Sequence, residues 1–97
     1  SYWQGATIRE LAGEEFSAFG VSKEDGGIHL LRVPDGSSAF RAGLRTGDLV
    51  QTIDGRAVGT IARLQQQTDG AEGKPLRVGF VRGQQSRTGT MASYGMR

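Results

Sequence analysis

The dipeptide Asp54-Gly55 places the strongest constraint on what this chain can fold into. It stands between the apolar stretch 49–53 and a short return at 56–58, and Asp-Gly in that setting is a strong signal for a two-residue β-hairpin. Sixteen glycines against two prolines indicate further tight turns, and hence short strands in preference to long helices. The chain is therefore predicted to be built on short antiparallel strands.

Alternating apolar residues and turn residues predict the other elements. We expect strands at residues 5–11, 28–33, 49–53, 56–58, 76–81 and 86–92. We expect one or two helical turns at 14–19, a short helix capped by Ser37 or Ser38 that runs to Ala42, and a longer helix at 60–68. In the longer helix Ile61, Leu64 and Thr68 fall on one face. The predicted fold class is α+β, mainly β: a small antiparallel barrel or sandwich capped by two helices, in a single domain of 97 residues.

The positive charge is concentrated in the last quarter of the chain. Residues 74–97 carry five basic side chains and no acidic one, although the net charge of the whole chain is only +2. The basic residues lie about five positions apart and do not form the clustered stripe that is typical of nucleic-acid binding. We interpret them as solvated side chains of a hairpin and expect no nucleic-acid partner.

Several kinds of chemistry have no residues to support them. The chain has no cysteine, and His29 is its only histidine, so no ligand set has the spacing of a zinc site. Ser37-Ser38 lacks the strand-turn-helix pattern of a nucleophile elbow. We predict no catalytic residue, no metal and no cofactor, and hence a domain that is not an enzyme. No apolar run approaches 18 residues, so no membrane span is expected in this segment.

Short motifs between residues 27 and 58 follow one another in a specific order. They are Gly27-Ile28-His29-Leu30-Leu31-Arg32-Val33, Asp35-Gly36-Ser37-Ser38-Ala39, Ala42-Gly43-Leu44, Gly47-Asp48-Leu49-Val50 and Ile53-Asp54-Gly55, followed by Val58. Their order and spacing resemble the signature of PDZ domains, in the bacterial subtype found in HtrA-like serine proteases. Trp3-Gln4-Gly5-Ala6-Thr7-Ile8 and Phe19-Gly20-Val21 also resemble that subtype, so the match covers about residues 3–91. The resemblance implies one domain, 1–97, cut out of a larger protein.

The resemblance also implies where a ligand would bind. PDZ domains take the free C-terminus of a partner, which adds as a strand to a sheet edge beside a helix. By this resemblance the carboxylate-receiving loop is Trp3-Gln4-Gly5-Ala6 and the pairing edge is Ala6-Thr7-Ile8-Arg9. The groove-lining helix is 60–68, with Thr60, Leu64 and Gln67 or Thr68 facing the groove and Leu64 as the floor of the pocket for the last side chain. Thr60 has two open roles, because its hydroxyl either reads the ligand or caps the helix.

Two residues depart from the family pattern. Gln4 and Ala6 stand where the family usually has large apolar side chains, so the pocket is either larger and takes a bulky last residue, or has decayed. The first hypothesis is a peptide-binding module, regulatory or substrate-presenting, of a bacterial protease. The alternative is a structural or docking domain of another hydrolase whose groove is degenerate. The expected partner is a protein C-terminus or the parent chain, and the expected location is extracytoplasmic, in the periplasm.

Overall fold

The computed structural model describes residues 1–11, 15, 17, 26–71 and 73–92. The helical turns that we predict at 14–19 therefore lie largely outside the described residues, as does the stretch Phe19-Gly20-Val21. Across the described ranges, no helix has the length and apolar character needed to cross a membrane.

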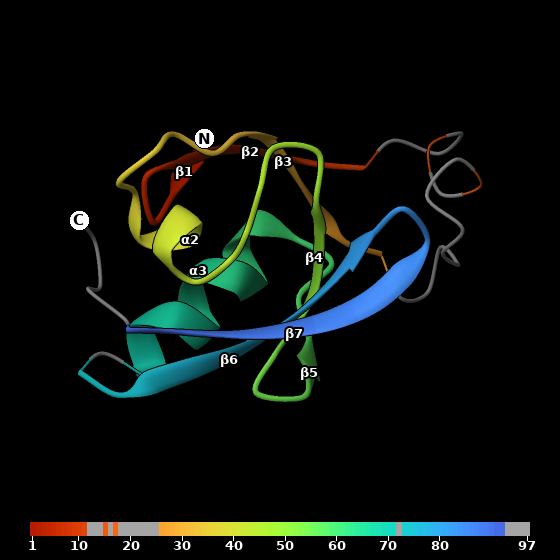
Figure 1. Cartoon of the computed structure of the whole chain (residues 1–97). Helices are drawn as coiled ribbons and strands as arrows, with labels where there is room; N and C mark the ends of the chain where they lie inside the picture. The colour runs from red at the N-terminus through yellow and green to blue at the C-terminus, as the bar shows by residue number, and fades with distance from the viewer. Residues whose placement is uncertain (12–14, 16, 18–25, 72, 93–97) are drawn as a thin grey trace.

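The described residues form one antiparallel sheet of seven strands (Figure 1). The strands are β1 (Tyr2–Trp3), β2 (Ala6–Glu10), β3 (Ile28–Arg32), β4 (Leu49–Ile53), β5 (Arg56–Ala57), β6 (Pro75–Arg82) and β7 (Gln85–Ala92). Their order in the sheet is β1-β2-β3-β4-β6-β7, with β5 paired to β4. Helices α2 (Ser38–Arg41) and α3 (Ile61–Gly70) lie within the continuous described ranges. Figure 1 shows both helices beside the curved sheet, with the β6–β7 hairpin crossing in front, and the predicted α+β, mainly β class is confirmed.

Side-chain alternation along the strands builds the core. On β6, Leu76 and Val78 are fully buried while Arg77 between them is exposed, as expected for a strand with one face toward solvent. On α3, Leu64 and Thr68 are the buried residues. The predicted apolar face of this helix is thus confirmed for both, and Ile61 packs partly buried against the same core.

The helix ends and the Asp-Gly hairpin are those that local chemistry predicts. The Ser37 hydroxyl accepts the backbone N–H of Phe40 at 3.1 Å and begins α2. The Thr60 hydroxyl accepts the backbone N–H of Arg63 at 3.2 Å and begins α3. Asp54 and Gly55 have φ of 52° and 82°, the left-handed values that a type I′ hairpin requires, and they join β4 to β5.

The N-terminal strand differs from its prediction. The predicted strand 5–11 is observed as β2, Ala6–Glu10, and it is preceded by β1, with Trp3 opposite Ala6 in an antiparallel pair. Gln4 and Gly5 form the connecting turn, with φ of 51° and 86°. Glutamine is not among the residues that favour this turn, so its sequence carries a weak hairpin signal.

Candidate functional site

The turn between β1 and β2 is held in place by the start of α2. The carbonyl of Gln4 accepts the backbone N–H of Ala39 at 3.1 Å. A Cβ on Gly5 would lie 2.7 Å from the Cβ of Ser37, which is closer than side chains approach. Two independent reasons therefore favour glycine at position 5: its φ is positive, and a side chain there would collide with the helix cap.

Strand β2 presents two small or apolar side chains to the interior. Ala6 and Ile8 are buried, whereas Thr7 and Arg9 are half-buried. The strand pairs with β3 along one edge and with β1 along the other. The predicted pairing edge is thus a real strand, and its outer edge is held by residues of the same chain.

Helix α3 contributes residues of three different exposures. Thr60 is exposed and caps the helix, Gln67 is half-buried, and Leu64 has no exposed surface. For Thr60 the capping role is observed, and whether its hydroxyl also reads a ligand stays a prediction. Because Leu64 is entirely within the core, it would line a groove only if the side chains that now cover it moved away.

A hydrogen bond joins the predicted loop to the predicted helix. The indole Nε1 of Trp3 donates to Oγ1 of Thr68 at 2.9 Å, and this hydroxyl donates in turn to the carbonyl of Leu64 at 2.7 Å. Trp3 is only 4% exposed, and it shares one core cluster with Ala6, Ile8 and Leu64. The structure therefore brings the loop, strand and helix residues together, while their role in binding a peptide stays a prediction.

Glu10 is a contact of this region that the sequence reasoning missed. Its Oε2 accepts the backbone N–H of Ile61 at 3.0 Å, so the last residue of β2 reaches the N-terminus of α3. An acidic residue is favoured at a helix N-terminus because it balances the positive end of the helix dipole. The sequence offers no local signal for this contact, since the two residues lie 51 positions apart.

Arg9 and His29 face each other across β2 and β3. Arg9 forms an ion pair with Glu15, which raises the pKa of the Arg9 guanidinium. Burial, and next the positive charge of Arg9, lower the pKa of His29. His29 is half-buried on its strand.

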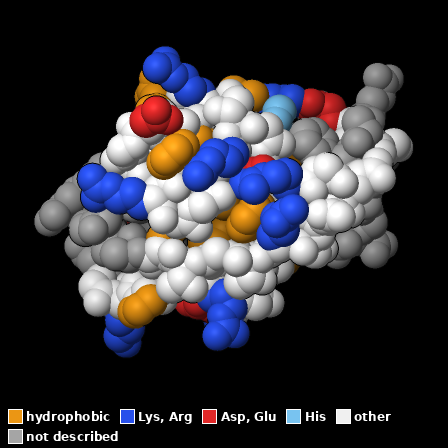
Figure 2. All heavy atoms as spheres, in the orientation of Figure 1, with side chains coloured by type: hydrophobic (Ala, Val, Ile, Leu, Met, Phe, Trp, Pro, Cys, Tyr) orange, Lys and Arg blue, Asp and Glu red, His pale blue; other side chains and the backbone are white. Residues whose placement is uncertain are grey.

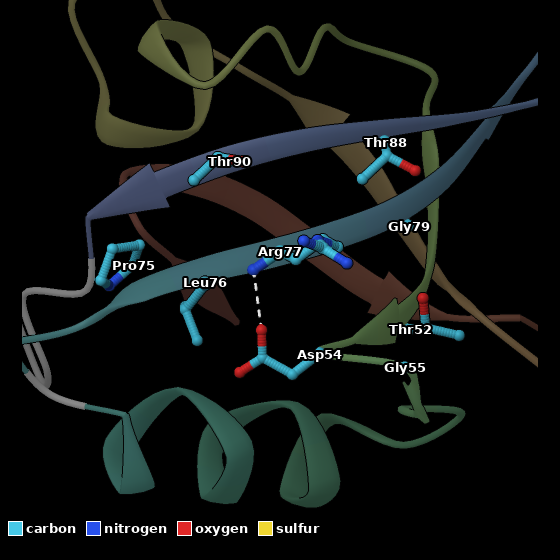
Figure 3. Close-up of a pocket in the computed structure, with 9 residues that line it drawn as sticks. All are labelled: Thr52, Asp54, Gly55, Pro75, Leu76, Arg77, Gly79, Thr88 and Thr90. Atoms are coloured by element: carbon cyan, nitrogen blue, oxygen red, sulfur yellow. Dashed lines mark hydrogen bonds between the residues drawn. The ribbon is translucent and has the colours of Figure 1, made fainter.

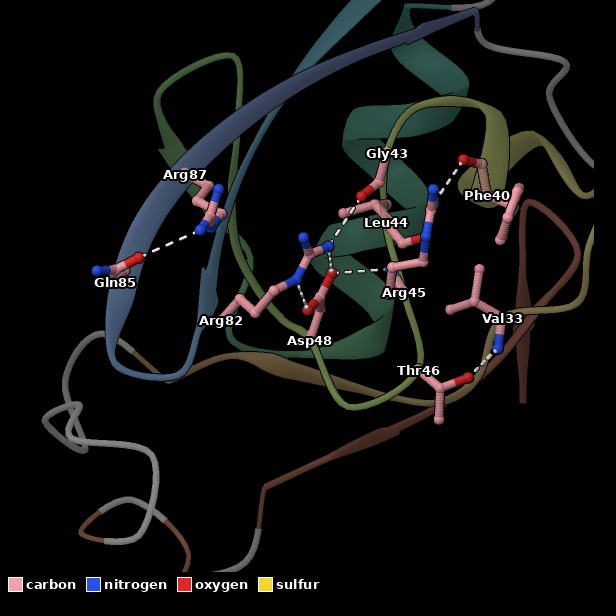
Figure 4. Close-up of polar contacts among 10 residues, drawn as sticks. All are labelled: Val33, Phe40, Gly43, Leu44, Arg45, Thr46, Asp48, Arg82, Gln85 and Arg87. Atoms are coloured by element: carbon pink, nitrogen blue, oxygen red, sulfur yellow. Dashed lines mark hydrogen bonds and ion pairs between the residues drawn. The ribbon is translucent and has the colours of Figure 1, made fainter.

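The Gly47-Asp48 turn carries the most enclosed charged group among the described residues. Asp48 is 1% exposed, and its Oδ2 accepts the backbone N–H of Arg45 at 2.8 Å, the turn contact expected for an aspartate there. Its two carboxylate oxygens also accept from Arg82 at 2.8 and 2.7 Å (Figure 4). This pair raises the pKa of Arg82. Asp48 therefore fastens β6 to the β3–β4 connection, a structural role.

The basic side chains of the C-terminal hairpin differ in exposure and in pairing. Arg77 and Arg87 are exposed, as predicted, but Arg82 is half-buried and paired with Asp48.

Arg45 stacks over the ring of Phe40, with its guanidinium carbon 3.8 Å from the ring centroid. Figure 2 shows Lys and Arg side chains gathered around apolar ones on this face of the molecule.

A hollow of about 430 Å³ lies on the β4, β6 and β7 part of the sheet. At its centre Gly79 lies opposite Thr52 of β4 and Thr88 of β7 in the ladder (Figure 3), and the Thr52 hydroxyl fills the space that a side chain on Gly79 would need. Asp54 Oδ1 accepts the backbone N–H of Arg77 at its rim. The lining residues are Thr52, Asp54, Gly55, Pro75, Leu76, Arg77, Gly79, Thr88 and Thr90. None of the predicted peptide-binding residues is among them.

Comparisons with known proteins identify the fold. The structure superposes, over 93% of this chain, on two structures of the HtrA-type protease AlgW with a decapeptide. The TM-score is 0.81 for a substituted form of AlgW and 0.73 for AlgW itself, and the sequence identity is 25% in both cases. The match covers 27% and 28% of the two AlgW chains. The structure also superposes, with a TM-score of 0.77 and 23% identity, on the HtrA3 PDZ domain bound to the phage-derived ligand FGRWV, covering 82% of that chain. The chain is a PDZ domain of the bacterial HtrA-like type.

Curated relatives agree with this family assignment. The PDZ domain is 38% identical over 64 residues to "Putative serine protease HhoA" of Synechocystis sp. and 34% identical over 61 residues to "Putative serine protease HhoB" of the same organism. These matches span 65% and 62% of this chain but only 16% and 15% of the two relatives. No family model matches the chain. The predicted resemblance is thus confirmed, through proteases that are several times longer than this domain.

Proposed function

We propose that this PDZ domain binds the C-terminus of a partner protein as an added strand in a groove between β2 and α3. The observation that carries the proposal is the convergence of a glycine turn, strand β2 and a helix at one place, joined by the hydrogen bond from Trp3 to Thr68. The Gln4-Gly5 turn has two consecutive left-handed residues, and successive backbone amides at such turns form concavities that bind anions. A terminal carboxylate is such an anion. Three similar solved structures hold peptides.

In this proposal the domain is non-catalytic, and it is a regulatory or substrate-presenting part of a protease that works outside the cytoplasm. Support for the protease context comes from the two Synechocystis relatives and from AlgW. The groove residues are those inferred from the resemblance: Trp3, Gln4, Gly5, Ala6, Thr7, Ile8, Thr60, Leu64, Gln67 and Thr68. Nucleic acid is not a partner in this proposal.

The test is a screen of a random library of peptides with free C-termini against the isolated domain. We expect binding with dissociation constants between about 1 µM and 1 mM, and loss of binding when the same peptides carry a C-terminal amide. Gln67→Trp places bulk beside the proposed groove and should abolish binding. Gln66→Trp, on the adjacent exposed position, is the matched control and should bind as the unchanged domain does. Peptides that bind equally well as amides would contradict the proposal.

A docking domain with a closed groove is the second candidate, and one observation favours it. The outer edge of β2 is paired with β1, and Trp3 and Gln4 at that edge are 4% and 5% exposed. Such a domain would contact its parent chain and bind none of the peptides. A screen without hits at about 1 mM peptide, together with binding to the rest of the parent protein, would establish this reading.

A further inference from the structure

Strand β2 has two edges, and both carry a neighbouring strand. β3 pairs along one edge, while on the other Tyr2 lies opposite Thr7 and Trp3 lies opposite Ala6. The backbone N–H of Ile8 donates to the carbonyl of Ser1 at 2.8 Å. In an antiparallel ladder alternate residues bond to the same side, so Ala6 and Ile8 direct their backbone groups toward β1. A ligand strand that adds to β2 needs this edge.

The side chain of Trp3 crosses from this edge to α3. Its indole is buried and donates to Thr68 in the third turn of the helix. Trp3 is paired with Ala6, the first residue of β2, so a ligand strand that added antiparallel to this edge would have a residue of its own opposite Ala6. Ala6 and Trp3 are both buried in the same core cluster.

The far end of the same space is bridged as well. Glu10, the last residue of β2, accepts the backbone N–H of Ile61 in the first turn of α3. The space between strand and helix is therefore spanned by Trp3 at one end and by Glu10 at the other. A peptide strand that paired with the Ala6 end of β2 would therefore overlap Ser1–Trp3, which lies at the opposite end of the strand from Glu10.

We propose that Ser1–Trp3 is an intramolecular occupant of the peptide groove, which a ligand must displace. Residues Ser1 to Trp3 mimic the last three residues of a ligand strand, with Trp3 in the pocket for the last side chain. The proposal rests on the proposed function and adds its regulation and ligand class. The preferred ligand ends in a large aromatic residue, and tryptophan is best because its indole replaces the hydrogen bond to Thr68. The apparent dissociation constant of the intact domain equals the intrinsic one divided by the fraction of molecules in which β1 is unpaired.

The first experiment measures the affinity of free-carboxylate peptides that end in Trp, Phe or Ala for three forms of the domain. The forms are the unchanged domain, Trp3→Phe, which cannot donate to Thr68, and Phe80→Leu. Phe80 is 5% exposed on β6, so its substitution controls for general loosening of the core. We expect Trp3→Phe to bind aromatic-ended peptides about 3- to 10-fold more tightly, since weakening the occupant raises the competent fraction. Phe80→Leu should leave the affinity within about twofold, and peptides that end in Ala should bind weakest.

The second readout does not depend on affinity. Trp3 is the only tryptophan of the chain, so its fluorescence reports on this ring alone. Saturation with a Phe-ended peptide should shift the emission to longer wavelength as Trp3 leaves its buried seat. Binding by the unchanged domain with no emission shift and no gain in Trp3→Phe overturns the proposal but leaves the peptide-binding function intact. Weaker binding by Trp3→Phe also overturns it, because Trp3 is then part of the wall that receives the ligand. No binding by any form overturns both the proposed function and the inference.

Discussion

Two hairpin turns of this domain have nearly the same φ angles and very different surroundings. Gln4 and Gly5 have φ of 51° and 86°, and Asp54 and Gly55 have φ of 52° and 82°. Gly55 has open space where a Cβ would be, and β5 beyond it is exposed. Gly5 lies against Ser37, and β1 before it contains the buried Trp3. One turn is explained by its own two residues, whereas the other is held by contacts with α2 and α3.

The largest difference should appear when a side chain beside each turn is removed. Trp3→Ala should lower the free energy of unfolding by about 3–5 kcal/mol, the cost of emptying a buried aromatic site. Arg56→Ala, in the exposed β5 strand, should change it by less than about 0.5 kcal/mol. Urea unfolding of both variants measures the difference, and equal effects would show that β1 is not part of the cooperative fold.

Substitution of the two glycines separates backbone strain from crowding. Gly55→Ala carries only the cost of a left-handed φ, about 1–2 kcal/mol. Gly5→Ala carries the same strain and a contact of 2.7 Å with the Cβ of Ser37, which adds about 1–3 kcal/mol of overpacking.

A double mutant isolates the crowding. Ser37→Gly keeps an acceptable helix cap at a cost of only a few tenths of a kcal/mol, so Gly5→Ala combined with Ser37→Gly should regain most of the added loss. If the two substitutions are additive in thermal unfolding, Ser37 does not crowd Gly5.

Removing the Thr68 hydroxyl tests the contact between the N-terminal turn and α3. Thr68→Val keeps the shape but leaves the indole N–H of Trp3 buried without its acceptor, which should cost about 1–3 kcal/mol. The same change at the exposed Thr90 of β7 should be within about 0.5 kcal/mol of neutral. An equally small effect at Thr68, measured by chemical denaturation, would mean that the indole finds another partner.

The smallest effect is a pH dependence in the strands next to the N-terminal turn. Burial lowers the pKa of His29 below its ordinary value of 6.5, so the folded state binds this proton less tightly than the unfolded chain does. The stability that the fold gains with His29 neutral is therefore fully present above about pH 6.5, and it is lost as the pH falls toward the pKa of His29 in the folded state. Unfolding curves between pH 5 and 8 should show this slope, and His29→Gln should remove it.

Much of the fold follows from short-range patterns. The alternation of Leu76 and Val78 with Arg77, the caps Ser37 and Thr60, and the Asp54-Gly55 hairpin are all observed as predicted. Each is decided by residues within about four positions of one another, and such interactions are readable in one sequence.

The residues of the candidate site could be named from the sequence, and their role in binding stays a prediction. The motif resemblance selected Trp3, Ala6 and Leu64, and the structure places all three in one core cluster. It gave no indication of β1, because Gln4-Gly5 is a weak hairpin signal, nor of the carboxylate of Glu10 at the start of α3.

By itself, the sequence determined where this domain turns and which faces of its strands and of α3 are apolar, and it carried the resemblance to PDZ domains. Only the tertiary structure decided that Trp3 donates to Thr68, 65 residues away, that Arg82 pairs with Asp48, 34 residues away, and that β1 covers the outer edge of β2. The physical reason is range. Turns and caps form through hydrogen bonds between near neighbours in the chain, whereas these contacts exist only after the sheet and α3 have brought distant segments together.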